Sequence, residues 1–231
     1  MKQVVLLFLF ISSVAFSQEK LNQFDEHGKR HGKWQKKYEG TNKVRYSGEF
    51  KHGKEIGVFK FYHKKSEKHP STIKTFNEDN DIAEVKHYTS SGKLVSQGKM
   101  KGKELIGKWV YYQKKSNEVL SEEFYKNGLL EGVRKVYYHG GKLAEEENYQ
   151  KGKLHGERKM YSETGVLIKH FNYVDGEIHG KVQYFDGNGK LAIDGKYNMG
   201  KRVSIWKYYK NGKLYEEKDY TISKNPYKKK T

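Results

Sequence analysis

The amino-acid sequence predicts an all-β protein, an elongated antiparallel β-meander of about eight hairpin repeats of about 24 residues each. Three observations predict this fold class. A glycine recurs at a nearly fixed interval, an alternating apolar and polar run follows it, and turn-forming residues divide each interval in two. The recurring glycines are Gly28, Gly53, Gly102, Gly128, Gly152, Gly176 and Gly200. The interval from Gly53 to Gly102 is twice the period, which predicts a degenerate copy near residue 78, with Asn80 in the left-handed backbone position.

Each repeat is expected to form two strands. A second glycine follows the first after four residues in most copies, as Gly57 follows Gly53. The next run alternates, as in GVFKFYH, so that Phe59 and Phe61 point to one face of a strand. A hairpin signal such as Asn211-Gly212 comes next, and then a second run such as GKLYEEKDY. No stretch keeps a helical period, and the glycine spacing would break a helix, so no helix is expected.

The two ends of the chain differ from the repeats. Residues 1–17 have one lysine, a short apolar run and small residues, which is the layout of a secretory signal peptide. The apolar run is too short to span a bilayer, so no transmembrane segment is expected. The repeat domain is assigned to residues 18–220 and a basic tail to residues 221–231. We therefore expect an exported protein, periplasmic or secreted.

Composition narrows the class of protein further. The chain has 231 residues, a net charge of +18, 19 tyrosines and no cysteine. Without cysteine there can be no disulfide, no thiolate zinc site and no lipid anchor on a cysteine. Many tyrosines and few aliphatic residues are typical of a thin sheet whose side chains are half exposed. Charge and aromatic residues together also suit single-stranded nucleic acid, but an exported protein is not expected to meet it.

One repeat resembles a known family. The segment YSGEFKHGKEIGVF resembles a MORN repeat at Tyr46, Gly48, Glu49, Gly53 and Gly57. Copies with G-x-W-x-x-Y-Y followed by N-G-K-L are similar to the bacterial variant of YwqK-like proteins. The resemblance implies a module for interaction and scaffolding, and it carries the label of a toxin–antitoxin system antitoxin. With an export signal, an antitoxin of this kind would meet its toxin outside the cytoplasm.

No catalytic, nucleotide or metal site is expected. The segment GEFKHGKE matches a phosphate-binding loop only in part, because it lacks the final hydroxyl residue and the following helix. His31, His155 and His179 each precede a second glycine. Copies in successive hairpins would lie about 10 Å apart, so at most two would converge, whereas zinc usually takes three or four ligands. We expect no metal and no cofactor.

Carboxylates occur in runs, at Glu122–Glu123, Glu145–Glu147 and Glu216–Glu217. Neighbours on a strand face opposite sides of the sheet, so these runs are not paired acids. Glu122, Glu147 and Glu216 are each expected to face a lysine across a hairpin. With no converging acid, base or nucleophile, the chain is not expected to be an enzyme.

Candidate binding residues fall into three groups. The aromatic group would contact a partner if exposed and would form the core if buried: Trp34, Phe59, Trp109, Tyr111, Trp206 and Tyr208. Arg134 and Arg158 replace the aromatic residue in adjacent repeats, so packing alone explains the stretch 128–162 least. A lysine row follows the first glycines, at Lys29, Lys54, Lys103, Lys153 and Lys201, and a second row follows the hairpin glycines, at Lys93, Lys142, Lys190 and Lys213.

Two functions are consistent with these groups. The first is a protein-binding scaffold, antitoxin- or immunity-like, whose partner is a toxin or an envelope protein. The alternative is an envelope-associated protein that recognises anionic lipid or polysaccharide through the lysine rows and the aromatic residues. The lysines could equally serve solubility and protect the sheet from edge association.

Overall fold

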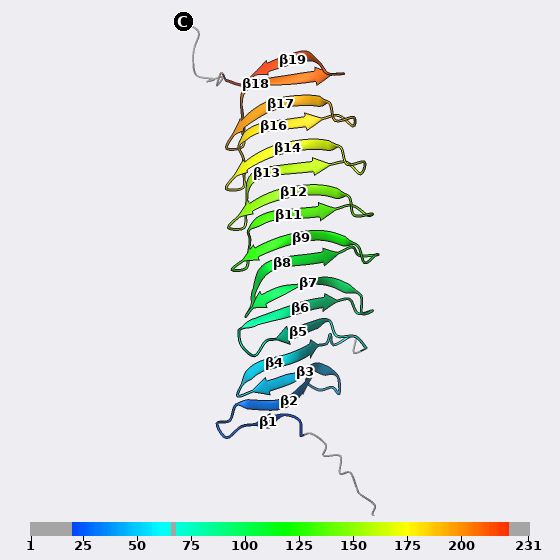
Figure 1. Cartoon of the computed structure of the whole chain (residues 1–231), viewed down its shortest axis with the longest axis vertical. Helices are drawn as coiled ribbons and strands as arrows, with labels where there is room; N and C mark the ends of the chain where they lie inside the picture. The colour runs from blue at the N-terminus through cyan, green and yellow to red at the C-terminus, as the bar shows by residue number, and fades with distance from the viewer. Residues whose placement is uncertain (1–19, 66–67, 222–231) are drawn as a thin grey trace, which may run out of the picture.

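The computed structural model describes residues 20–65 and 68–221. Throughout these residues the chain is strand, turn and irregular segment without helix, and every strand is antiparallel to its neighbours. Figure 1 shows one open sheet in which the strands follow one another in chain order. The prediction of an all-β antiparallel meander is confirmed. The predicted signal peptide, residues 1–17, and nearly all of the predicted tail lie outside the described residues. Among the described residues there is no helix of the length and apolarity that crossing a membrane requires.

The strands are β1 (Gln23–Phe24), β2 (Arg30–Lys37), β3 (Val44–Lys51), β4 (Lys54–Phe61), β5 (Thr72–Phe76), β6 (Ile82–Tyr88), β7 (Leu94–Lys101), β8 (Glu104–Tyr112), β9 (Val119–Lys126), β10 (Leu129–Leu130), β11 (Gly132–Tyr137), β12 (Leu143–Gln150), β13 (Lys153–Tyr161), β14 (Leu167–Val174), β15 (Glu177–Ile178), β16 (Gly180–Phe185), β17 (Leu191–Asn198), β18 (Lys201–Lys210) and β19 (Lys213–Asp219). The short strands β10 and β15 each continue into the longer strand that follows the second glycine of their repeat.

The recurring glycines form tight turns along one margin of the sheet, which we call the glycine margin and which lies at the left in Figure 1. Lys151 and Gly152 have φ of 49° and 80°, as in the type I′ turn that joins two strands through two residues. The N–H of Gly152 donates to the carbonyl of Leu130 in the preceding repeat at 2.8 Å, and Gly176 bonds Leu154 in the same way. These bonds fix the spacing from one repeat to the next.

The opposite margin, which we call the loop margin, carries longer turns. In the turn after β16, Asp186 Oδ1 accepts the N–H groups of Asn188 and Lys190, both at 2.9 Å. Gly189 takes the left-handed position of this turn, with φ of 79°.

The degenerate repeat near residue 78 is present but differs from its prediction. Residues 77–81 join β5 to β6, in place of the two-residue turn of other repeats. Asn80 was expected in the left-handed conformation, and the structure corrects this, since its φ is not positive. Its side chain instead accepts the N–H of Ile82 at 2.9 Å, so the asparagine shapes the turn through its amide.

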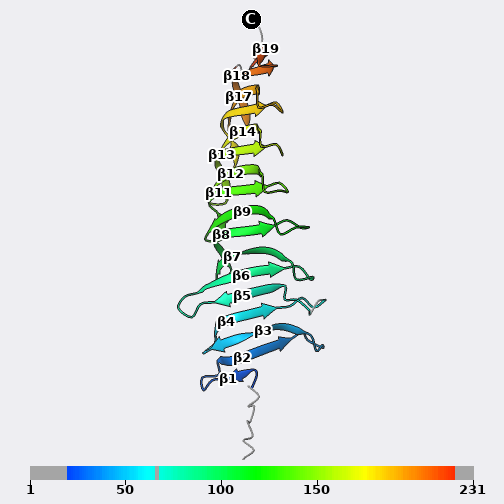
Figure 2. The same ribbon diagram turned by 45° about the vertical axis from the view of Figure 1, so that its right-hand side comes forward.

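The strand register aligns side chains in columns across the sheet. Because side chains alternate and each residue faces a partner on the next strand, one column lies on one face from end to end. We call this the central column: Trp34, Gly48, Phe59, Lys74, Val85, Gly98, Trp109, Glu123, Arg134, Glu147, Arg158, Phe171, Val182, Gly195, Trp206 and Lys218. The face that carries it is the aromatic face. Figure 2 shows the described strands as a single layer.

The largest buried side chains of the central column are aromatic rings that lie against glycines. Trp109 and Trp206 are each 1% exposed, and Phe59 is fully buried. A Cβ atom added to Gly48, Gly98 or Gly195 would lie 2.4 Å from the ring opposite it. Glycine is therefore needed across from each of these rings. Because glycine has no side chain, the ring can lie directly against the backbone of the neighbouring strand and be buried in a single-layered sheet.

Candidate functional site

The aromatic candidates separate into core and surface. Phe59, Trp109 and Trp206 are buried on the central column, so they form the core and are not available as contacts. Tyr111 and Tyr208 are half-buried in the next column of the aromatic face. Trp34, which lies in the first complete hairpin, is also half-buried. The Phe24 ring packs edge-on against it, with ring centroids 5.1 Å apart.

Arg134 and Arg158 lie in the middle of the central column, where they alternate with two buried carboxylates. Arg134 Nε is 3.0 Å from Glu123 Oε1, and Arg134 Nη1 is 2.8 Å from Glu147 Oε2. Arg158 Nε is 3.0 Å from Glu147 Oε1, and its guanidinium also pairs with Glu145. We call Glu123, Arg134, Glu147 and Arg158 the Arg–Glu ladder.

The ladder follows the same pairing rule as the rest of the column. Three other repeats place a glycine across from a tryptophan or phenylalanine, and these two place a glutamate across from an arginine. The two swaps accompany one another, because an arginine on this buried face needs a partner charge and a glycine could not supply one. This explains the arginines of the stretch 128–162 that packing alone left unexplained.

Of the three glutamates expected to face a lysine across a hairpin, only Glu122 does so. Glu147 faces Arg134 and Arg158 on the aromatic face, with its side chain 4% exposed. Glu122 lies on the opposite face and pairs with Lys108, and Glu216 pairs with Lys218 at 3.3 Å along the same strand. The expectation was wrong for Glu216, which has Tyr208 across the hairpin. It was also wrong for Glu147, because the sequence pattern does not say which face of a strand a run of three glutamates turns inward.

Tyrosines border the ladder on the side of the glycine margin. The Tyr125 hydroxyl donates to Glu123 at 2.6 Å and the Tyr149 hydroxyl donates to Glu147 at 3.0 Å. Burial, followed by the charge of Glu147, raises the pKa of Tyr149 to about 12. Burial opposes the charge on Arg134, but its bonds to Glu147 and Glu123 outweigh this and raise its pKa. Burial also opposes the charge on Arg158, but its bonds to Tyr173 and Glu145 raise its pKa as well.

The ladder is partly open to a partner. The side chains of Arg134 and Arg158 are each 27% exposed, whereas those of Glu123 and Glu147 are 12% and 4% exposed. Two guanidinium groups and the bordering tyrosines thus reach the surface of the aromatic face in a fixed arrangement. A paired buried charge contributes little net stability compared with apolar packing, so stability does not account for the ladder.

The lysine row of the glycine margin is exposed but mixed with acids. Lys29, Lys54, Lys103, Lys153 and Lys201 are all exposed. Lys54 Nζ lies 3.7 Å from Asp81 Oδ1. The positions that match Lys54 in two other repeats hold Leu129 and Glu177, so the row is interrupted.

The loop margin is more basic than the glycine margin. Its turns carry lysines at Lys43, Lys64, Lys65, Lys68, Lys93, Lys114, Lys115, Lys142, Lys190 and Lys213. The described acids of these turns are Glu39, Glu118, Glu163 and Asp186. Glu118 is bonded to His139 at 3.0 Å, and Asp186 accepts two backbone N–H groups. The two margins are therefore electrostatically different, which the lysine spacing did not reveal.

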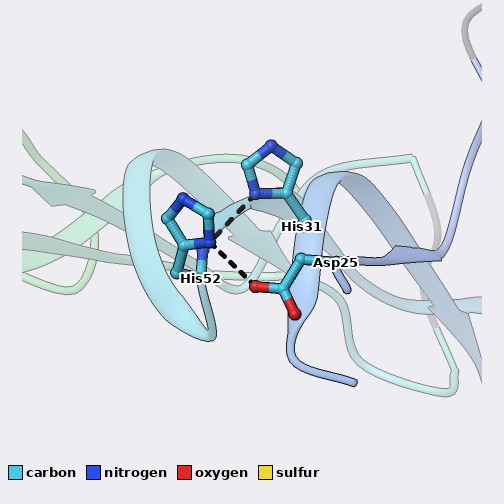
Figure 3. Close-up of side chains that lie close together, drawn as sticks. All are labelled: Asp25, His31 and His52. Atoms are coloured by element: carbon cyan, nitrogen blue, oxygen red, sulfur yellow. Dashed lines mark hydrogen bonds and ion pairs between the residues drawn. The ribbon is translucent and has the colours of Figure 1, made fainter. Parts of the chain in front are cut away.

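A separate cluster lies at the first glycine turns, where Asp25, His31 and His52 come together (Figure 3). His52 Nδ1 is 2.8 Å from Asp25 Oδ2, and the two imidazole rings have centroids 4.9 Å apart. One ligand atom from each residue lies within 4.8 Å of the others. This cluster was not predicted from the sequence, where His31 was grouped with His155 and His179 as residues that precede a second glycine. Its signal was the aspartate of DEHGK, three residues before Gly28, because none of the other recurring glycines has an aspartate at that spacing.

The fold and these surfaces define an open β-meander repeat protein whose described surfaces suit binding. Comparison with protein families finds the MORN repeat variant at residues 130–151, 154–175 and 178–199. MORN repeats are generally associated with the binding of proteins or membrane lipids. A search of curated proteins found no match to the chain. The matched residues include Arg134, Glu147 and Arg158. The match supports the MORN repeat variant and does not confirm the more specific resemblance to YwqK-like antitoxins.

Proposed function

We propose that this chain is a non-catalytic, exported repeat module that binds a protein partner across the Arg–Glu ladder and its bordering tyrosines. The observation that carries the proposal is the ladder itself: two arginines, whose side chains are each 27% exposed, stand where the other repeats have apolar side chains. Arginine and tyrosine are enriched among the residues that dominate protein interfaces. Repeat arrays of this kind usually bind across several copies.

The arrangement also favours a specific partner over a nonspecific one. Each guanidinium is held by two carboxylates, so its remaining N–H groups point in fixed directions and lose little entropy on binding. A partner that offers carboxylates or carbonyl oxygens at the matching spacing would be selected. An antitoxin- or immunity-like role, with a toxin met outside the cytoplasm, is the finer form of this proposal.

Site-specific photocrosslinking in native cells tests the surface. A photoreactive phenylalanine at Tyr149, beside the ladder, is compared with the same residue at Phe124, which is 43% exposed on the opposite face. We expect one protein to be captured from position 149 and not from position 124. Capture of the same protein from both positions, or from neither, would contradict the proposal.

Affinity measurements then test the role of the ladder. With the captured partner purified, Arg158→Met should weaken binding at least tenfold, whereas Lys201→Met on the glycine margin should leave binding unchanged. Circular dichroism establishes that both variants keep the sheet. Equal affinity of the two variants would place the contact elsewhere.

The loop margin favours a second candidate, the binding of an anionic lipid or polysaccharide surface. Its lysines outnumber its described acids, and two of those four acids, Glu118 and Asp186, are engaged within the protein. Co-sedimentation with phosphatidylglycerol vesicles should then fall steeply as salt rises. Changing Lys64, Lys65, Lys114 and Lys115 to glutamine should abolish co-sedimentation. Binding that is insensitive to salt would exclude this candidate.

A further inference from the structure

We propose that Asp25, His31 and His52 form a binding site for a single zinc-class divalent metal ion at the N-terminal end of the repeat array. The three side chains come from different segments: Asp25 from the turn before β2, His31 from β2, and His52 from the turn between β3 and β4. The register of the sheet brings them together at the glycine margin (Figure 3).

The carboxylate is held in place before any metal arrives. Asp25 Oδ1 accepts the N–H groups of His27 at 3.0 Å and Lys29 at 2.8 Å. This leaves Oδ2 directed at His52 Nδ1, at 2.8 Å. The Asp25 side chain is only 8% exposed, so one oxygen is fixed by the turn and the other is presented to the imidazoles.

The two histidines are close enough to share a ligand and free enough to adjust. Both are exposed, and the His52 side chain is 62% exposed. Tetrahedral zinc with ligand bonds of 2.0–2.1 Å needs ligand atoms about 3.3 Å apart. The ligand atoms now lie at most 4.8 Å apart, and small rotations of the exposed rings would bring them to the spacing that zinc requires.

The donor set selects the class of ion. Two imidazole nitrogens and one carboxylate oxygen suit Zn²⁺ and its neighbours, whereas Mg²⁺ and Ca²⁺ prefer oxygen ligands throughout. Three protein ligands leave one tetrahedral position for water or for a group from a partner.

The chain contains a matched arrangement that lacks one ligand. His155 and Asp175 occupy the positions of His31 and His52 in later repeats, with Nδ1 and Oδ1 at 3.6 Å. Tyr149 stands where the first turn has Asp25. The site is therefore expected once in the described array, because none of the other recurring glycines has an aspartate three residues before it.

Isothermal titration of tag-free protein with ZnCl₂ tests the site. We expect one zinc ion per chain, with binding weakened at least about tenfold by each of Asp25→Asn, His31→Gln and His52→Asn. Asparagine at 25 keeps the Oδ1 bonds of the turn, and asparagine at 52 tolerates the positive φ of 48° there. The control His155→Gln/Asp175→Asn should bind as the unchanged protein does.

A second readout separates coordination from a simple ion pair. Co²⁺ bound to three protein ligands and water should give the visible absorption of a tetrahedral ion, and Asp25→Asn should remove it. Absence of zinc binding, or equal loss in the control variant, would overturn the proposal. Binding that survives Asp25→Asn unchanged would also overturn it.

Discussion

Removing the carboxylate of Glu147 is the most direct test of the Arg–Glu ladder. Glu147→Ala removes the partner of Arg134 Nη1 at 2.8 Å, of Arg158 Nε at 3.0 Å and of the Tyr149 hydroxyl at 3.0 Å. Breaking a buried ion pair by removing one partner costs about 3–5 kcal/mol. Both arginines keep a second carboxylate and are 27% exposed, so we expect the lower end, about 3 kcal/mol.

The measurement is the free energy of unfolding in urea, followed by far-ultraviolet circular dichroism. The matched control is Glu146→Ala, the next residue on the opposite face, whose side chain is 29% exposed and lies 3.6 Å from Lys135. An exposed pair of this kind is worth about 0–1 kcal/mol. If Glu147→Ala costs no more than Glu146→Ala, the ladder is not a buried network and the reasoning fails.

Three further predictions follow from described contacts. Gly195→Ala should destabilise the sheet by about 1–3 kcal/mol, since its Cβ would lie 2.4 Å from the Trp206 ring, whereas Gly187→Ala, with open space around it, should be neutral in urea unfolding. In single-tryptophan variants, acrylamide should quench half-buried Trp34 strongly and Trp206, 1% exposed, weakly; equal quenching would contradict the assignment of core and surface. The pKa of Asp25 is lowered from 3.8 to about 2, first by its bond to a histidine, so its contribution to stability is present above about pH 4 and lost as pH falls towards 2. Asp25→Asn should remove that part of the acid dependence of the thermal midpoint, and an unchanged acid dependence would show that the carboxylate is not involved.

Much of the fold could be predicted from the sequence because each repeat is specified by turn-forming residues that act over a short range. The paired left-handed positions at Lys151 and Gly152 are a short-range signal that specifies a two-residue hairpin turn without knowledge of the rest of the chain. The alternating runs then specify which residues share a face. Asn80 shows the limit of this reasoning, because an asparagine can shape a turn through its side chain as well as through its backbone.

The ladder could not be predicted because it depends on which residues face one another across strands. Alignment on the glycines compared the first strand of each repeat, where Arg134 and Arg158 stand out. The explanation lies on the second strands, where Glu123 and Glu147 take the position of Gly195. Reading the two positions as a pair would have shown glycine with aromatic and glutamate with arginine. The cluster at Asp25 was missed for a similar reason, since it joins turns of two repeats.

The central column also determines which repeats could be exchanged or duplicated. Each repeat presents one residue to the repeat before it and another to the repeat after it, and only certain combinations fit. A duplication of residues 128–151 would set Arg134 of the new copy against Glu147 of the old one, a contact like the one Glu147 now makes with Arg158. Inserting after it a repeat that begins with Trp206 would press an indole onto a carboxylate, where it needs a glycine. The array can therefore lengthen within its charged middle by copying one unit, while its aromatic units can be moved only together with the glycine that precedes them.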